Sequence, residues 1–135
     1  MAILTWNEHC LVGVKTLDSQ HAGLIADLNQ LYSAITIGNA NCCADSPLRN
    51  LLKHALDHFS AEEELMVATE YPALVQHRAK HRNFVRQVEE YLARCKVGDN
   101  TMRIPLLNFI RDWLTNHIQE EDREYTPWFT EHGVR

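Results

Sequence analysis

Apolar residues recur every three or four positions in four long segments of the chain, and short polar or Gly- and Pro-containing segments separate them. This period places apolar side chains on one face of an α-helix. The pattern predicts four helices, over about residues 19–37, 47–70, 73–96 and 102–122. Residues 1–18 lack such a period and are expected to form an N-terminal arm. Residues 123–135 are expected to form an aromatic C-terminal tail.

The residues at the segment ends support these boundaries. Asp18 is a candidate N-cap for the first helix, and Ser46-Pro47 is a favourable helix start. Gly38, Tyr71-Pro72 and Gly98-Asp99-Asn100 interrupt the periodic segments. No segment has the alternation of a strand. The predicted fold is therefore all-α, an antiparallel up-down-up-down four-helix bundle formed by a single domain over residues 1–135.

Length and charge exclude several classes of protein. A chain of 135 residues suits one compact domain. The formal net charge is -5 and the basic residues are scattered, which argues against binding to nucleic acid. No apolar run reaches the roughly 18–20 residues that span a bilayer, so no membrane span is expected. The N-terminus lacks the pattern of a secretory signal, which favours a cytoplasmic location.

The four cysteines do not form a metal-binding or disulfide pattern. They are Cys10, Cys42, Cys43 and Cys95, with no CxxC pair. Reduced thiols are the expected state. An exposed redox role for the adjacent Cys42 and Cys43 is the alternative.

Histidine is unusually frequent, with eight residues in the chain, and several of them fall on the predicted inner faces of the helices. His21 lies on the inner face of the first helix, His58 and Glu62 on the second, His77 and His81 on the third, and His117 on the fourth. An unpaired charge in a core costs several kcal/mol, so such groups are expected to be paired or to coordinate a metal.

The spacing of these residues favours metal binding. Residues four apart lie one turn apart on nearly the same side of a helix, so His58-x3-Glu62 and His77-x3-His81 can each direct two ligands to one point. Nitrogen-rich ligand sets supplemented by oxygen suit iron, copper, zinc or manganese. Five histidines and two carboxylates are too many ligands for one ion and sufficient for two.

The same residues resemble the ligand pattern of the hemerythrin family, and in particular its single-domain bacterial branch, the bacteriohemerythrins. The resemblance consists of His21 after Asp18-Ser19-Gln20, His58-x3-Glu62, His77-x3-His81 and His117-x4-Asp122. Trp6-Asn7-Glu8, Val12-Gly13-Val14 and Trp113-Leu114 also match the bacterial branch. The resemblance extends over nearly the whole chain.

The resemblance implies a ligand set and a cofactor. His77, His81 and His117 would bind one iron ion, and His21 and His58 the other. Glu62 and Asp122 would bridge the two irons together with an oxo or hydroxo group. The iron of His21 and His58 would then have one position open to dioxygen. Four side chains are expected to form the walls of an apolar oxygen pocket there, namely Leu114, Trp113, Ile118 and Phe59.

The function implied is reversible dioxygen binding for oxygen storage, transport or delivery, without catalytic turnover. Ferritin-like di-iron enzymes use more carboxylate ligands, which stabilise high-valent iron. Two alternatives stay open: a di-iron enzyme that consumes peroxide or nitric oxide, and an oxygen or redox sensor that acts through a partner. Dioxygen is the expected ligand. An oxygen-consuming protein or a reductase is the expected type of protein partner, and the chain is expected to be a monomer.

The fourth helix contains a conflict between geometry and resemblance. A regular helix would pair His117 with Glu121, four residues on, whereas the family pattern selects Asp122, five residues on. The choice of Asp122 requires the helix to loosen, for example through a π-type turn. Glu120 and Glu121 would then be solvated. Five further residues are not expected to bind metal: Glu63, Glu64, His54 and the solvent-exposed His9 and His132.

Overall fold

A computed structural model of the chain describes residues 12–36, 45–96 and 103–134, and all regular structure within them is helical. The elements are α1 (Lys15–Thr36), α2 (Asp45–Ala68), α3 (Leu74–Lys96), α4 (Arg103–Asn116), the π-helix η3 (His117–Glu121), α5 (Asp122–Glu124) and α6 (Thr126–Glu131). The predictions for residues 1–11, for Cys42 and Cys43 and for the turn at residues 98–100 lie outside the described residues.

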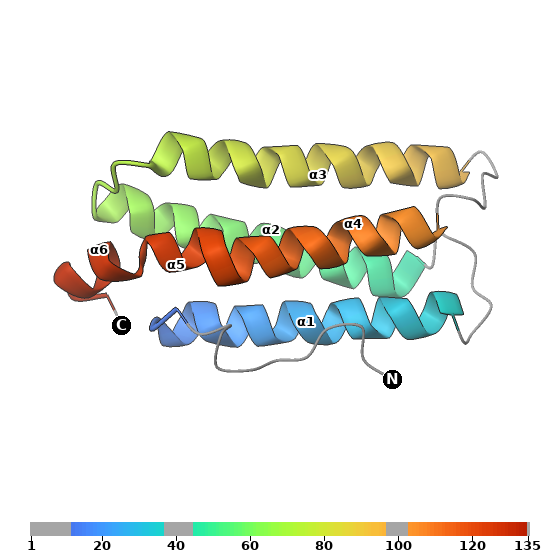
Figure 1. The fold of residues 1–135 in the computed structure, drawn as a ribbon, viewed down its shortest axis with the longest axis horizontal. Helices are drawn as coiled ribbons and strands as arrows, with labels where there is room; N and C mark the ends of the chain where they lie inside the picture. Colours follow the sequence, from blue (N-terminus) through green and yellow to red (C-terminus); the bar gives the residue numbers. More distant parts are fainter. Residues whose placement is uncertain (1–11, 37–44, 97–102, 135) are drawn as a thin grey trace.

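The four long helices form the predicted bundle. Figure 1 shows α1 to α4 lying side by side, with each helix running in the opposite direction to the one before it. The short helices α5 and α6 continue α4 at the end of the bundle where α2 is joined to α3 (Figure 1). Among the described helices, none is both long enough and apolar enough to cross a membrane.

The start of α1 differs from the prediction. The helix begins at Lys15, so Asp18 lies in its first turn and is not the N-cap residue. The Asp18 carboxylate instead accepts hydrogen bonds from the backbone N–H groups of Val12 (2.7 Å) and Gly13 (3.3 Å). Gly13 has φ +86°, a left-handed conformation that glycine adopts without strain. Hydrogen bonds to Asp18, in the first turn of α1, therefore hold Val12 and Gly13 in place before the helix.

The end of α2 reverses the chain through a left-handed residue. Glu70 has φ +55°. Next to it, the Tyr71 N–H donates to the Met66 carbonyl at 2.8 Å, and the Glu70 N–H donates to the Val67 carbonyl at 3.2 Å. This pair of hydrogen bonds is a Schellman motif, which satisfies the carbonyls at a helix end. It turns the chain so that α3 begins at Leu74 and packs back on α2.

The apolar core consists mainly of two clusters at different levels of the bundle. We call the larger one the apolar layer; its fully buried members include Leu28, Leu51, Phe84, Val88 and Ile110. We call the smaller one the end cluster; its buried members are Val12, Val14, Leu17, Met66, Tyr125 and Phe129. Tyr125 and Phe129 were predicted to belong to an aromatic C-terminal tail, and both are fully buried because the short helices fold over the end of the bundle.

Candidate metal centre

The polar residues predicted from the sequence lie between the apolar layer and the end cluster. Along α1, for example, Leu17 belongs to the end cluster, His21 to the polar level and Leu24 to the apolar layer. All seven predicted ligands are buried, with at most 5% of any residue exposed; they are His21, His58, Glu62, His77, His81, His117 and Asp122. We call this set the polar layer.

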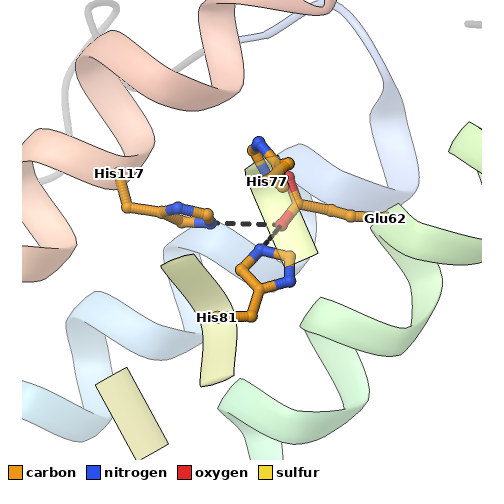
Figure 2. A group of neighbouring side chains, drawn as sticks. All are labelled: Glu62, His77, His81 and His117. Atoms are coloured by element: carbon orange, nitrogen blue, oxygen red, sulfur yellow. Dashed lines mark hydrogen bonds and ion pairs between the residues drawn. The ribbon is translucent and has the colours of Figure 1, made fainter. Parts of the chain in front are cut away.

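The side chains of α2 and α3 meet as their spacing predicted. Glu62 Oε1 lies 3.0 Å from His58 Nε2 and 3.2 Å from His81 Nε2. Glu62 Oε2 lies 3.6 Å from His77 Nε2. Figure 2 shows the imidazoles of His77 and His81, from α3, and of His117, from the start of η3, directed at this carboxylate. His117 Nε2 lies 3.1 Å from Glu62 Oε1. Glu62 therefore contacts histidines from α2, α3 and η3.

A π-helical turn brings Asp122 onto the same side as His117. The five residues of η3 replace a regular α-helical turn, and the backbone N–H of Asp122 donates to the carbonyl of His117, five residues earlier. In a regular α-helix five residues would rotate the side chain by about 140° away from His117. Asp122 is instead fully buried in the polar layer. The loosened helix expected from the sequence is present, and π-turns of this kind often occur at functional sites.

The two oxygens of Asp122 face two different groups of histidines. Oδ2 lies 2.7 Å from His21 Nε2 and 3.5 Å from His58 Nε2. Oδ1 lies 3.2 Å from His77 Nε2 and 3.0 Å from His117 Nε2. The carboxylate thus lies between a two-histidine group on α1 and α2 and a three-histidine group on α3 and η3.

These side chains form two sets that have the geometry to hold a metal ion. One set is Glu62, His77, His81 and His117, and the other is His21, His58, Glu62 and Asp122. Within each set the candidate ligand atoms lie within 4.8 Å of one another. Glu62 belongs to both sets. The described residues therefore offer two adjoining positions for metal ions, each with nitrogen and carboxylate ligands.

The buried polar atoms of the layer fit a metal centre. Glu62 Oε2, His77 Nε2, His81 Nε2 and Asp122 Oδ1 are inaccessible to solvent and have no well-formed hydrogen bond. Such atoms are rare in folded proteins, because leaving them without a partner costs roughly 1–3 kcal/mol each. A set of imidazole and carboxylate donors suits iron and similar transition metals. These residues could therefore hold a pair of non-haem iron ions.

The charges within the polar layer compensate one another strongly. Burial opposes protonation of His58 and His77, but Glu62 and Asp122 outweigh it and raise the pKa of each histidine from 6.5 to about 9. Burial likewise opposes ionisation of Glu62, but His58 and His117 hold its pKa well below 4.5. Burial and the charge of Glu62 would raise the pKa of Asp122, but contacts with His117 and His21 outweigh them and lower it. Metal ions would displace the histidine protons.

Aromatic side chains pack on the imidazoles of the three-histidine group. The Phe59 ring is stacked on His81, with ring centroids 4.0 Å apart and planes at 7°. The Trp113 ring is stacked on His117, with centroids 4.4 Å apart. Of the other two predicted pocket residues, Leu114 is fully buried in the apolar layer and Ile118 is buried beside Ile25 of α1. Phe59 and Trp113 therefore lie at the boundary of the polar layer.

Three residues of the site were missed from the sequence. Glu63 accepts a hydrogen bond from His81 Nδ1 at 2.9 Å, and Gln20 accepts one from His58 Nδ1 at 2.8 Å. Tyr125 is fully buried, and burial, Asp122 and Glu62 together raise its pKa well above 10. The adjacency of Glu63 to Glu62 and of Gln20 to His21 was visible in the sequence. Which neighbouring ring each side chain contacts depends on the packing between helices.

The remaining histidines of the described chain lie outside the polar layer. His54 is paired with Asp27 of α1, and its side chain is 52% exposed. His132 is exposed and its Nδ1–H donates to the Trp128 carbonyl at 2.7 Å. Neither belongs to a candidate metal set. The residue Glu64, next to Glu63, is exposed.

The fold and the site together define a helical-bundle protein with a buried histidine–carboxylate cluster suited to metal. A family model, the hemerythrin HHE cation binding domain, matches residues 12–129. The chain therefore belongs to the hemerythrin family. Members of this family bind iron and oxygen.

Individual relatives agree with this assignment. A bacteriohemerythrin of Stenotrophomonas maltophilia (strain R551-3) is 31% identical over 93% of this chain and 80% of the relative. A hemerythrin-like protein of Naegleria gruberi is 32% identical over 89% of this chain and 88% of the relative. A crystal structure of wild-type hemerythrin superposes with a TM-score of 0.83 at 28% identity, covering 93% of this chain and 97% of that chain.

Proposed function

We propose that this protein binds dioxygen reversibly at a di-iron centre held by the polar layer, and that it stores, transports or delivers oxygen. In this proposal His77, His81 and His117 hold one iron, His21 and His58 hold the other, and Glu62 and Asp122 bridge them with an oxo or hydroxo group. When bound there, the iron pair supplies the electrons for reversible dioxygen binding.

The observation that carries the proposal is the unequal division of the histidines. Three imidazoles meet on one side of Glu62 and Asp122, and two meet on the other. Only Glu62 belongs to both candidate sets, but Asp122 Oδ1 also lies 3.2 Å from His77 Nε2 and 3.0 Å from His117 Nε2. If both carboxylates bind on both sides, as we propose, the two-histidine side offers one protein ligand fewer. A small exogenous ligand would find its place on that side.

The chain's own residues provide a dry environment for such a ligand. The polar layer is buried between two apolar clusters, and Leu114 and Ile118 are at most 1% exposed. Phe59 and Trp113 stack on imidazoles of the three-histidine group and so restrict the movement of these rings. An apolar surround disfavours the escape of charged species and therefore slows irreversible oxidation. We therefore propose Leu114, Ile118 and Phe59 as walls of the oxygen pocket, since the centroid of the Phe59 ring also lies 6.0 Å from that of the His58 ring. Trp113, the fourth predicted wall, packs on the three-histidine side instead.

The proposal is tested by cycling the iron-loaded protein between anaerobic and aerobic solution. We expect two irons per chain by elemental analysis. After reduction without air, a visible charge-transfer band should appear on addition of dioxygen and disappear when dioxygen is removed. At least several such cycles should be possible without loss of amplitude.

Other outcomes would favour the other functions. Steady consumption of dioxygen or peroxide in the presence of a reductant would indicate an enzyme and contradict simple carriage. Irreversible oxidation at the first exposure to air would also contradict it. A dioxygen-dependent change in binding to a second protein would instead favour a sensor.

A further inference from the structure

The two histidine groups of the polar layer have chemically different partners on their outer sides. His81, of the three-histidine group, donates its Nδ1–H to the Glu63 carboxylate at 2.9 Å. His58, of the two-histidine group, donates its Nδ1–H to the Gln20 amide oxygen at 2.8 Å. One imidazole is therefore backed by a negative charge and the other by a neutral group.

Glu63 is itself held in place from outside. Its second oxygen accepts a hydrogen bond from Arg78 Nε at 2.7 Å. The Glu63 side chain is only 23% exposed and that of Arg78 32%. Arg78 is one residue after His77 on α3, so the same helix that carries two of the histidines also fixes the carboxylate behind one of them. Phe59 stacks on the face of the His81 ring, which leaves the imidazole little freedom to rotate.

We infer that Glu63, anchored by Arg78, is a positioning residue that directs His81 Nε2 into the polar layer and strengthens it as a metal ligand. The inference rests on the proposed metal centre. A carboxylate that accepts the Nδ1–H draws this proton away from the ring and makes Nε2 a stronger electron donor. An amide has a much smaller effect. The three-histidine side should therefore bind metal more tightly and stabilise its oxidised state more than the two-histidine side.

The test removes the charge of Glu63 and keeps its shape. Glu63→Gln is compared with the native chain and with Glu64→Gln, a matched control that neutralises the exposed neighbouring glutamate. The full-length metal-free proteins are titrated with cobalt(II), and the midpoint potential of each iron-loaded protein is measured. We expect Glu63→Gln to weaken one of two cobalt equivalents by roughly 10–100-fold, the usual effect of losing an outer partner. Its midpoint potential should rise, whereas Glu64→Gln should match the native chain.

A reciprocal variant sharpens the test. Gln20→Glu should place a carboxylate behind His58 and lower the midpoint potential, the opposite of Glu63→Gln. If Glu63→Gln fails to fold by circular dichroism, Glu63→Asp serves instead; it shortens the side chain, draws the carboxylate away from His81 Nδ1 and should shift affinity and potential in the same direction by a smaller factor.

Two results would overturn the inference: native cobalt affinity and potential in Glu63→Gln, or equal changes in Glu63→Gln and Glu64→Gln. Cobalt binding requires no dioxygen chemistry, so this result is separate from the proposed function. A native chain that binds two metal ions but not dioxygen reversibly would contradict the function alone.

Discussion

The polar layer and the apolar layer occupy neighbouring levels of the same bundle, yet they are filled in opposite ways. In the apolar layer, side chains such as Leu28, Leu51 and Phe84 fill the space between the helices and need no specific partner. In the polar layer, five histidines and two carboxylates fill the same kind of space, and each must find a partner of suitable charge. The first level stabilises the fold through buried area alone. The second is stable only because its charges compensate one another or bind metal.

This difference separates the sources of stability and of function within one small protein. Substitutions in the apolar layer away from Phe59 and Leu114, which we also assign to the oxygen pocket, should change the free energy of unfolding and leave the metal content unchanged. Substitutions in the polar layer should change metal binding first. The end cluster, with Tyr125 and Phe129, closes the polar layer on its other side, so the layer is enclosed without belonging to either apolar cluster.

The largest effect is expected for Asp122→Asn compared with Glu121→Gln. Asp122 contacts histidines of both groups, so its loss should weaken metal binding by more than the roughly 100-fold upper effect of an outer partner. Glu121→Gln neutralises the carboxylate that regular helix geometry would select and should leave two metals per chain. Elemental analysis after equilibration with a chelator measures both. Greater metal loss from Glu121→Gln than from Asp122→Asn would contradict Asp122 as the metal ligand. It would favour Glu121, the residue that regular helix geometry selects.

The next effect is expected for Leu51→Ala, with Leu56→Ala on the same helix as its control. Leu51 is fully buried and Leu56 is 51% exposed. The buried substitution should reduce the free energy of unfolding by about 2–5 kcal/mol. Thermal melting of the metal-free chains should show a decrease of roughly 10 °C for Leu51→Ala and little change for Leu56→Ala. Loss of metal stoichiometry in a folded Leu51→Ala protein would show that the two layers are not independent.

The smallest effect is expected for the pH dependence of the metal-free chain. The pKa values of His58 and His77 are raised from 6.5 to about 9, so their charge pairs stabilise the fold fully below pH 6.5 and lose that effect as the pH rises through 9. The lowered pKa of Glu62 has the opposite pH dependence. The ionised Glu62 stabilises the fold above pH 4.5, and this stabilisation is lost in more acidic solution.

The melting temperature of the metal-free protein should therefore be highest between about pH 4.5 and 6.5 and fall by a few degrees towards pH 10. The metal-loaded protein is the control, since its imidazoles are already deprotonated and should not produce this alkaline decrease. An identical pH profile for the two forms would mean that the histidines of the polar layer are not protonated in the metal-free fold.

The bundle and most of the polar layer could be predicted from the sequence because their signals are local. A period of 3.6 residues places Leu24 and Leu28, or His77 and His81, on one helix face whatever the rest of the chain does. Charged groups on an otherwise apolar face then indicate a shared site, because burial without partners is unfavourable. These arguments located His21, His58, Glu62, His77, His81 and His117. The resemblance to the hemerythrin family added Asp122.

Other features depended on specific contacts that the helical period does not predict. α1 begins at Lys15, three residues before the predicted N-cap, because Asp18 holds the backbone of Val12 and Gly13. The predicted tail folds because Tyr125 and Phe129 find an apolar surface at the end of the bundle. Glu63 and Gln20 look like ordinary polar residues until α2 is packed against its neighbours.

By itself, then, the sequence determined the helices, their apolar faces and the histidines on them, since each follows from the regular geometry of one helix. Helix geometry alone could not select the carboxylate of the last helix that enters the polar layer; the family resemblance selected Asp122, and only the tertiary structure shows how it is buried there. Regular geometry would have chosen Glu121; the π-turn η3 instead turns Asp122 inward. The physical reason is that Asp122, once buried, contacts histidines from α1, α2, α3 and η3 at once. No local pattern along the chain contains those contacts.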